Sequence, residues 1–163
     1  MVSNYGISKD DERIIGKADG IKEVEYGYFK DVVISGTDRS MRIYSKPDAV
    51  STYDVTEGRL PKRTGEIALD MKERDRFAVG STLNVTEKTD IAGGTVLRHH
   101  KFTVVGFVRA SETLSCLNMG QSAAGGGELK GYAVAVPGEF DSDVKMIARA
   151  TYEDTEGLDY WSA

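Results

Sequence analysis

Residues able to carry acid–base, nucleophilic or metal chemistry are few in this chain. Its only two histidines, His99 and His100, are adjacent. Neighbouring side chains of an extended segment point to opposite faces of a sheet, so these two imidazoles are not expected to ligate one metal ion. The single cysteine, Cys116, excludes an intrachain disulfide and a cysteine-based zinc site. We therefore predict no metal site.

The candidate nucleophiles are Ser122 and Cys116. Residues 120–124 read Gly-Gln-Ser-Ala-Ala, one glycine short of the G-x-S-x-G elbow. A serine nucleophile also needs a histidine oriented by a carboxylate, and Cys116 has no charged activator beside it in the sequence. A hydrolase or transferase stays open as an alternative, and it requires His99 or His100 to meet Cys116 and Ser122 in one pocket.

Phosphate- and calcium-binding loops are not indicated either. The three glycines at 125–127 are followed by Glu128, where a phosphate loop needs Lys and then Ser or Thr, and a carboxylate there would repel phosphate. The acidic pair Asp141 and Asp143 lacks the spacing of a calcium loop. We expect no cofactor and no catalytic activity.

The composition indicates a strand-rich domain. The chain has 163 residues, enough for one domain or two subdomains that share a core. It contains 15 valines against 8 leucines, and β-branched side chains favour strands. Its net charge of −5 argues against nucleic-acid binding, because neutralisation of phosphates supplies most of that affinity. No apolar run approaches the roughly 18 residues of a membrane span.

One helix and a series of strands are predicted. Ser8 followed three residues later by Asp11 predicts a helix over residues 9–18, with Gly20 after its end. Charged residues 71–76 predict a single helical turn. Apolar alternation and short apolar runs predict strands near residues 24–28, 32–34, 41–44, 53–55, 66–69, 81–87, 96–108, 132–136 and 145–153. In the last of these, we expect Met146, Ala148, Ala150 and Tyr152 to face inward and Lys145, Ile147, Arg149 and Thr151 to face outward.

Short motifs occur in one order along most of the chain. They are Gly-Ile-Lys-Glu-Val at 20–24, Gly-Arg-Leu-Pro at 58–61, Gly-Glu-Ile-Ala-Leu at 65–69, Val-Gly-Ser-Thr-Leu at 79–83 and Phe-Thr-Val-Val-Gly-Phe at 102–107. In this order and spacing they resemble the extracytoplasmic domain, the MacB-like periplasmic core, of FtsX-like ABC-transporter permeases.

We interpret the motif residues as structural. Proline cannot donate to a strand ladder, so Pro61 ends a strand, and Gly65 and Gly80 suit turns with positive φ. We expect the charges of Arg59 and Glu66 to be solvated or locally paired. The full set is Gly58, Arg59, Leu60, Pro61, Gly65, Glu66, Gly80 and Gly106.

The resemblance implies an α+β fold with two parts. Residues 1–50 plus 131–163 would form a porter-like mixed α/β part, and residues 51–130 an inserted β-rich subdomain. The domain would lie between the first and second transmembrane helices of a permease, on the extracytoplasmic face of a bacterial cytoplasmic membrane, and the resemblance points to a Gram-positive bacterium. It would be a non-catalytic module that couples binding outside the membrane to ATP hydrolysis by a separate cytoplasmic subunit.

The implied partners are the transmembrane helices of the same permease, a second permease copy, the ATPase subunit indirectly, and a peptide, lipid or cell-wall protein. We further expect residues 113–127 to be a contact loop that presents Leu114, Leu117 and Met119; the alternative is a loop without a role. A freestanding extracellular ligand-binding or adhesion module is the main competing function. An ATPase gene beside a longer reading frame would favour the permease.

Overall fold

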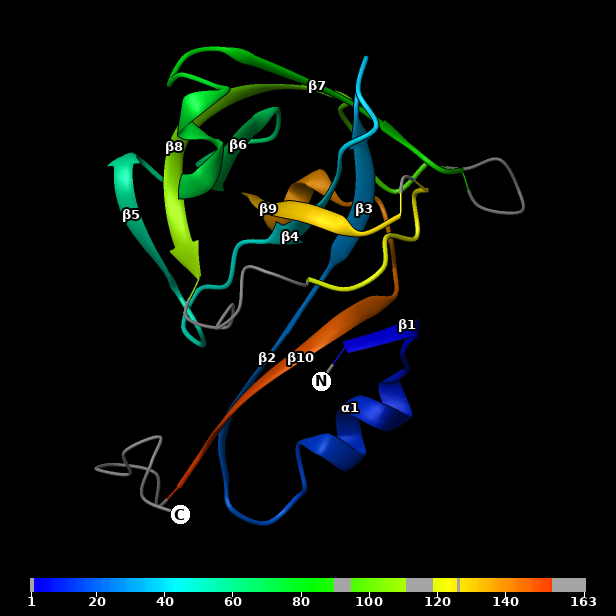
Figure 1. The fold of residues 1–163 in the computed structure, drawn as a ribbon. Coiled ribbons are helices and arrows are strands. Elements are labelled where there is room, and N and C mark those ends of the chain that lie inside the picture. Colours follow the sequence, from blue (N-terminus) through cyan, green and yellow to red (C-terminus); the bar gives the residue numbers. More distant parts are fainter. Residues whose placement is uncertain (1, 90–94, 111–118, 126, 154–163) are drawn as a thin grey trace.

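Two sheets make up the protein (Figure 1). The computed structural model describes residues 2–89, 95–110, 119–125 and 127–153. A three-stranded sheet consists of β1 (Val2–Ile7), β10 (Lys145–Tyr152) and β2 (Ile21–Gly27), with β10 in the centre. The chain between β2 and β10 builds the seven-stranded sheet.

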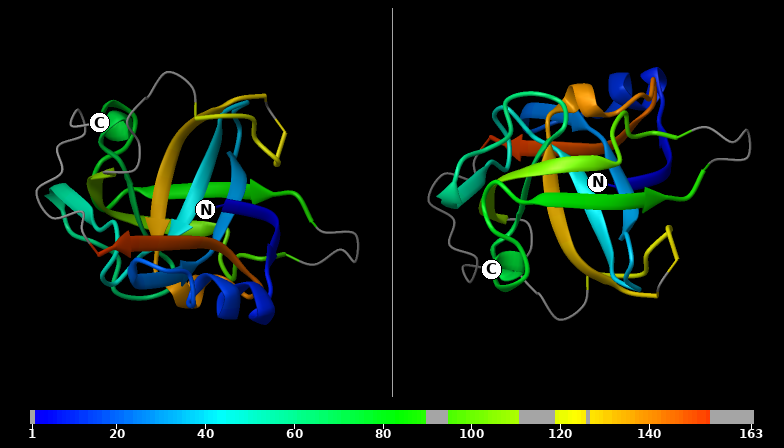
Figure 2. Two further views of the ribbon diagram at one scale, coloured as in Figure 1. Left: turned by 90° about the horizontal axis from the view of Figure 1, so that it is seen from below. Right: turned by 90° about the horizontal axis from the view of Figure 1, so that it is seen from above.

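Six strands of the larger sheet close into a barrel. In ring order they are β8 (Lys101–Ala110), β6 (Glu66–Asp70), β9 (Leu129–Ala135), β4 (Ser40–Ser45), β3 (Phe29–Ile34) and β7 (Thr82–Glu87), and β7 pairs again with β8. The β6–β8 and β4–β9 pairs are parallel and the others antiparallel. In Figure 2, β7 and β8 run across β4 and β9. β5 (Tyr53–Gly58) pairs with the second half of β8 outside the ring.

The barrel core follows from strand alternation. Apolar side chains at every second position point inward and form one cluster, which includes Val32, Ile43, Leu69, Val104 and Phe107, each at most 1 % exposed. A second cluster lies on the outer face and contains Tyr53, Ala68, Val108, Tyr132 and Val134. β8 contributes to both clusters, so the central position expected for residues 102–108 agrees with its burial on both faces.

The small sheet carries the one α-helix of the described residues, α1 (Lys9–Ile15) (Figure 1). Ser8 caps it as expected: the N–H of Asp11 donates to the Ser8 hydroxyl oxygen, and the N–H of Ser8 donates to the Asp11 carboxylate. The helix ends three residues earlier than predicted. Gly16 closes it by donating its N–H to Glu12, and glycine is a poor residue for continuing a helix.

The α+β class with a porter-like part, expected from the sequence, is wrong. Within the described residues the fold is mostly β, with ten strands, and the seven residues of α1 bury no side chain. The second helical turn expected at 71–76 is a 3-10 helix, η1 (Met71–Asp75), and a further short one is η2 (Pro137–Glu139). The physical cause is the valine-rich composition, which places nearly all of the core on strands.

Residues 147–149 of the last strand are buried on both faces, contrary to the expected pattern, and Tyr152, expected to face inward, is 55 % exposed. Ala148 is buried as predicted, but Ile147 and Arg149, expected to face outward, are 3 % and 5 % exposed. β10 lies between α1 on one face and the barrel on the other, which single-faced alternation cannot indicate. In the β2–β10 ladder, Ala150 pairs with Val24 and Ala148 with Tyr26. No helix among the described residues has the length and apolar character needed to cross a membrane.

Candidate functional site

The motif residues meet where β5, β6 and β8 adjoin. Arg59 binds Glu66 in a bidentate ion pair, with Nη1 2.7 Å from Oε2 and Nη2 2.7 Å from Oε1. The Glu66 carboxylate also accepts the N–H of Lys62 at 3.0 Å and Nε of Arg63 at 3.0 Å. The Arg59 hydrogen bonds lower the pKa of Glu66 to about 2. The two charges are therefore locally paired and hold the start of β6 to the segment after β5.

Two motif glycines let β5 approach β8 closely. Gly58 pairs with Gly106, and Gly58 has a φ of +69°. A Cβ atom on Gly106 would collide with the backbone O and N of Arg59. Leu60 packs against the outer cluster, and the next residue, Pro61, is buried. The chain can turn from β5 into the Arg59 segment only because both positions lack a side chain.

The remaining motif glycines hold turns against the same strands. Gly65 has a φ of +76°, accepts the N–H of Thr103 through its carbonyl, and donates its N–H to Oε2 of Glu139 at 2.8 Å. Gly80 has a φ of +89° and donates its N–H to the carbonyl of Val104 at 2.7 Å. The motif residues from Gly58 to Gly106 thus lie in one part of the barrel wall, whereas the motif at 20–24 begins β2 of the small sheet.

Each histidine faces a different buried carboxylate. Nδ1 of His99 lies 2.9 Å from Oε1 of Glu139, and the His99 N–H donates to the same oxygen at 2.7 Å. Nε2 of His100 lies 3.4 Å from Oε1 of Glu87. Both carboxylate side chains are fully buried. The strand expected from residue 96 begins only at Lys101, so both histidines lie before β8, but their rings still contact different carboxylates.

These contacts close one end of the barrel with the segment that precedes β8. Leu97, 2 % exposed, joins the barrel core, forms a β-bridge with Phe140, and donates its N–H to Oε1 of Glu87 at 3.3 Å. The N–H of Arg98 donates to the Glu139 carbonyl at 2.9 Å. His99 and His100 therefore act, in this geometry, as anchors of a cap.

Among the described residues, Ser122 makes no hydrogen bond with a histidine. Ser122 accepts the N–H of Ala124 on its hydroxyl at 3.1 Å and donates its own N–H to Gly127. Cys116 lies outside the described residues. Among the described residues, no group of three or more His, Cys, Asp or Glu side chains is arranged to hold a metal ion.

The expected contact loop is described only in part. Leu114 and Leu117 lie outside the described residues. Met119 is half-buried and packs against the outer cluster that contains Tyr53 and Tyr132. The loop's contact role stays a prediction.

A cavity of about 330 Å³ lies between the barrel and the small sheet. β3 contributes Phe29, Lys30 and Asp31, the chain after β7 contributes Lys88, the 121–125 segment contributes Ala124, and β10 contributes Met146. Sequence reasoning missed this site because its residues come from four separate segments. The one signal available was a charged pair, Lys30 and Asp31, inside an otherwise apolar strand.

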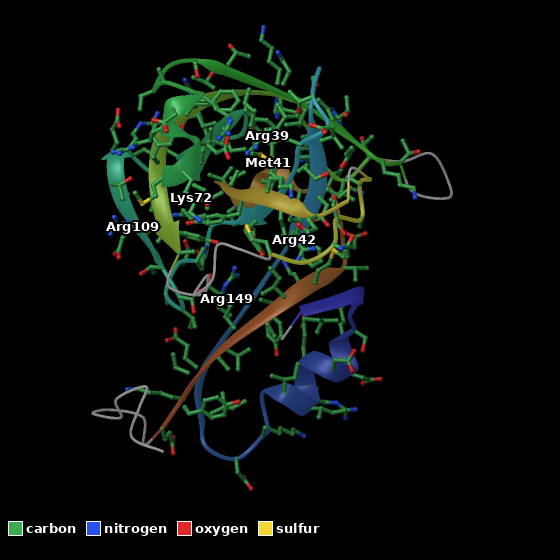
Figure 3. The ribbon with its side chains drawn as sticks, in the orientation of Figure 1. Arg39, Met41, Arg42, Lys72, Arg109 and Arg149 are labelled. Carbon is green, nitrogen blue, oxygen red and sulfur yellow. The ribbon has the colours of Figure 1, made fainter. Side chains whose placement is uncertain are left out.

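Polar contacts join β2 and the residue that follows it, Tyr28, to the end of β4 and the chain after it. The Tyr28 N–H donates to the Ser45 hydroxyl at 2.8 Å, and the Ser45 N–H donates to the Tyr28 carbonyl at 2.9 Å. The Glu25 carboxylate accepts the N–H groups of residues 48–50. Burial acts to raise the pKa of Glu25, but these donors and the charge of Arg149 lower it. Figure 3 shows Arg149 between the small sheet and the barrel.

A second, apolar groove of about 470 Å³ lies between α1 and the outer face of the small sheet. Ile14, Ile15 and Ala18 line one side and Ala148, Ala150 and Tyr152 the other. Ile14 and Tyr152 are largely exposed.

Neither known family models nor curated proteins match this chain.

Proposed function

We propose that the chain is a non-catalytic extracytoplasmic domain of an FtsX-like, MacB-type ABC-transporter permease. The observation that carries the proposal is the topology of the small sheet: β1 and β2 both pair with β10, and the whole barrel is looped out between β2 and β10. A domain inserted between two membrane helices needs entering and leaving strands that lie together. The motif order seen in the sequence supports the same family.

In this proposal the barrel is the sensing part and the small sheet the connection to the membrane. A displacement of β2 and β10 reaches the barrel through the reciprocal Tyr28–Ser45 hydrogen bonds and the Glu25 clamp on residues 48–50. Lys145 adds a third link, because its ammonium lies 4.1 Å from the centre of the Tyr28 ring. ATP is hydrolysed by a separate cytoplasmic subunit. Peptides, lipids and cell-wall proteins are the partner classes.

Labelling of intact cells tests whether the domain lies on the extracytoplasmic face of the membrane. In a Cys116→Ser background, a cysteine introduced at the exposed Lys101 is treated with a membrane-impermeant maleimide. We expect labelling in intact cells, while a cytoplasmic control cysteine is labelled only after lysis. Labelling of the Lys101 site only after lysis would show that the placement is wrong.

Association with other proteins distinguishes a permease domain from a freestanding module. Purification of the protein from its own host in mild detergent should recover an ATPase subunit and a chain with spanning helices on both sides of this domain. Recovery of the domain from the culture fluid, without either, would favour a freestanding binding or adhesion module.

A further inference from the structure

The cavity between the barrel and the small sheet combines apolar walls with positive charge at its rim. Phe29 and Met146 supply apolar surface from two different sheets. The Arg42 guanidinium lies over the Phe29 ring, 4.3 Å from its centre, and helps to hold the ring in place. A volume of about 330 Å³ is at the lower end of the range typical of small-molecule sites.

The negative charge of the cavity floor is already compensated. Asp31 is 3 % exposed, and Arg42 binds it with Nε 2.6 Å from Oδ1 and Nη2 3.0 Å from Oδ2. The N–H of Ala123 donates to Oδ2 at 2.9 Å. This carboxylate is therefore neutralised and does not repel an incoming anion strongly.

The ammonium groups of the two rim lysines, Lys30 and Lys88, can still bind an anion. The Lys30 ammonium donates one hydrogen bond, to the Lys88 carbonyl at 3.1 Å, and lies 3.8 Å from Oε2 of Glu87. That buried oxygen has no hydrogen-bond partner, so the Lys30–Glu87 pair is long and loosely held. An ammonium carries three donors. For the exposed ammonium of Lys88, the described residues supply no carboxylate partner.

We propose that this cavity binds a small organic anion with an apolar body, such as an aromatic or short acyl carboxylate or sulfonate. The apolar body would lie between Phe29 and Met146, and the anionic group would meet Lys30 and Lys88. This site is independent of the permease assignment, since a freestanding module with the same cavity would bind the same class.

The test uses the full chain and two fluorescent probes of similar shape. 1-Anilinonaphthalene-8-sulfonate carries the anion, and N-phenyl-1-naphthylamine lacks it. We expect saturable one-to-one binding of the sulfonate and clearly weaker binding of the neutral probe. Lys88→Ala should weaken sulfonate binding about fivefold, as expected for one partly solvated ion pair, and leave the neutral probe unchanged. Lys101→Ala, an exposed lysine outside the cavity, is the matched control and should have no effect.

A second pair of variants locates the bound probe. Ala124→Trp fills the cavity from its exposed side and should abolish sulfonate binding, whereas Ala18→Trp fills the groove beside α1 and should not. Circular dichroism and thermal unfolding check that each variant is folded. Equal affinity for both probes, no effect of Lys88→Ala, loss of binding in Ala18→Trp alone, or no saturable binding would each overturn the proposal.

Discussion

The carboxylate of Glu139 accepts the backbone N–H of Gly65 at 2.8 Å although 74 residues separate them. Through its other oxygen it accepts the N–H of His99 at 2.7 Å. A single fully buried side chain on η2 therefore ties together the turn before β6 and the cap before β8. This link depends on two carboxylate oxygens that serve two separate backbone donors.

Replacement of Glu139 by glutamine tests that link. An amide has only one acceptor oxygen, so Glu139→Gln leaves one buried N–H facing an NH₂ group. We expect a loss of about 2 kcal/mol in the free energy of unfolding, measured by urea denaturation at neutral pH. Asp141→Asn, which alters a surface ion pair with Arg98, is the control and should cost less than about 0.5 kcal/mol. Equal costs for the two variants would mean that Glu139 is not a link of this kind.

The Arg59–Glu66 pair predicts a defined dependence of stability on pH. The pKa of Glu66 is lowered to about 2 by the Arg59 hydrogen bonds, from a usual value of 4.5. A lowered folded-state pKa stabilises the fold above the unfolded-state value, and the contribution is lost as the pH falls from about 4.5 to about 2. The unfolding temperature of Glu66→Gln should therefore be lower than that of the parent at pH 7. The difference between the two unfolding temperatures should become smaller as the pH falls from about 4.5 to about 2.

A matched variant separates this effect from general acid sensitivity. Glu57→Gln changes an exposed carboxylate on the neighbouring strand β5. Its unfolding temperature should follow that of the parent at every pH. A Glu66→Gln difference that stays constant between pH 7 and pH 2 would contradict the assigned pKa.

The close approach of β5 and β8 makes Gly106 intolerant of any side chain. A Cβ atom there would collide with the Arg59 backbone, which cannot rotate away as a flexible side chain would. We expect Gly106→Ala to destabilise the protein by about 2–3 kcal/mol in urea denaturation. Gly138→Ala, whose Cβ would only touch the Thr64 methyl at 3.8 Å, is the control and should change stability by less than about 0.5 kcal/mol.

Local patterns predicted the local elements, and the mistakes arose where two distant segments meet. The Ser8–Asp11 capping box and the strands β3 and β4 were predictable because each depends on nearby residues. The α+β class was wrong because it followed from the resemblance, whereas the valine-rich composition places nearly all of the core on strands. The two-sided burial of β10 depends on the barrel packing against Arg149, which no alternation in residues 145–153 encodes.

The candidate cavity was unpredictable for the same reason. Lys30, Lys88 and Met146 become neighbours only because β3, the chain after β7 and β10 converge. By contrast, the prediction that His99 and His100 do not share one partner agrees with the structure, although both precede β8 and neither lies in a strand. Their partners, Glu139 and Glu87, are isolated acids in the sequence and gave no signal of their burial.

Ionisation of the Asp70 side chain lowers the stability of the fold, and replacement of Asp70 by asparagine should remove that cost. Burial raises the pKa of this carboxyl, so ionisation of Asp70 destabilises the folded state above its unfolded-state pKa. Its side chain also caps η1 by accepting the N–H of Lys72 at 3.2 Å. Asparagine keeps that acceptor, so Asp70→Asn should raise the unfolding temperature at pH 7, with a gain that shrinks as the pH falls through the acid range. Asp70→Ala loses the cap and should be less stable than Asp70→Asn by about 1 kcal/mol.

The reciprocal Tyr28–Ser45 hydrogen bonds predict how motion passes between the sheets. Ser45 is 2 % exposed, and its hydroxyl is the acceptor for the Tyr28 N–H. Ser45→Ala leaves that N–H without its acceptor, which should cost about 1–2 kcal/mol. Amide hydrogen exchange should then quicken at Tyr28 while exchange at Val104 and Ala133, in the barrel, changes only with global stability.

Ser40→Ala, which removes a hydroxyl that donates to the Gly125 carbonyl, controls for loss of a buried serine on the same strand. Under the permease proposal, we expect Ser45→Ala, and not Ser40→Ala, to weaken the coupling between stimulus and ATP hydrolysis. Equal coupling in both variants would mean that this junction does not carry the signal.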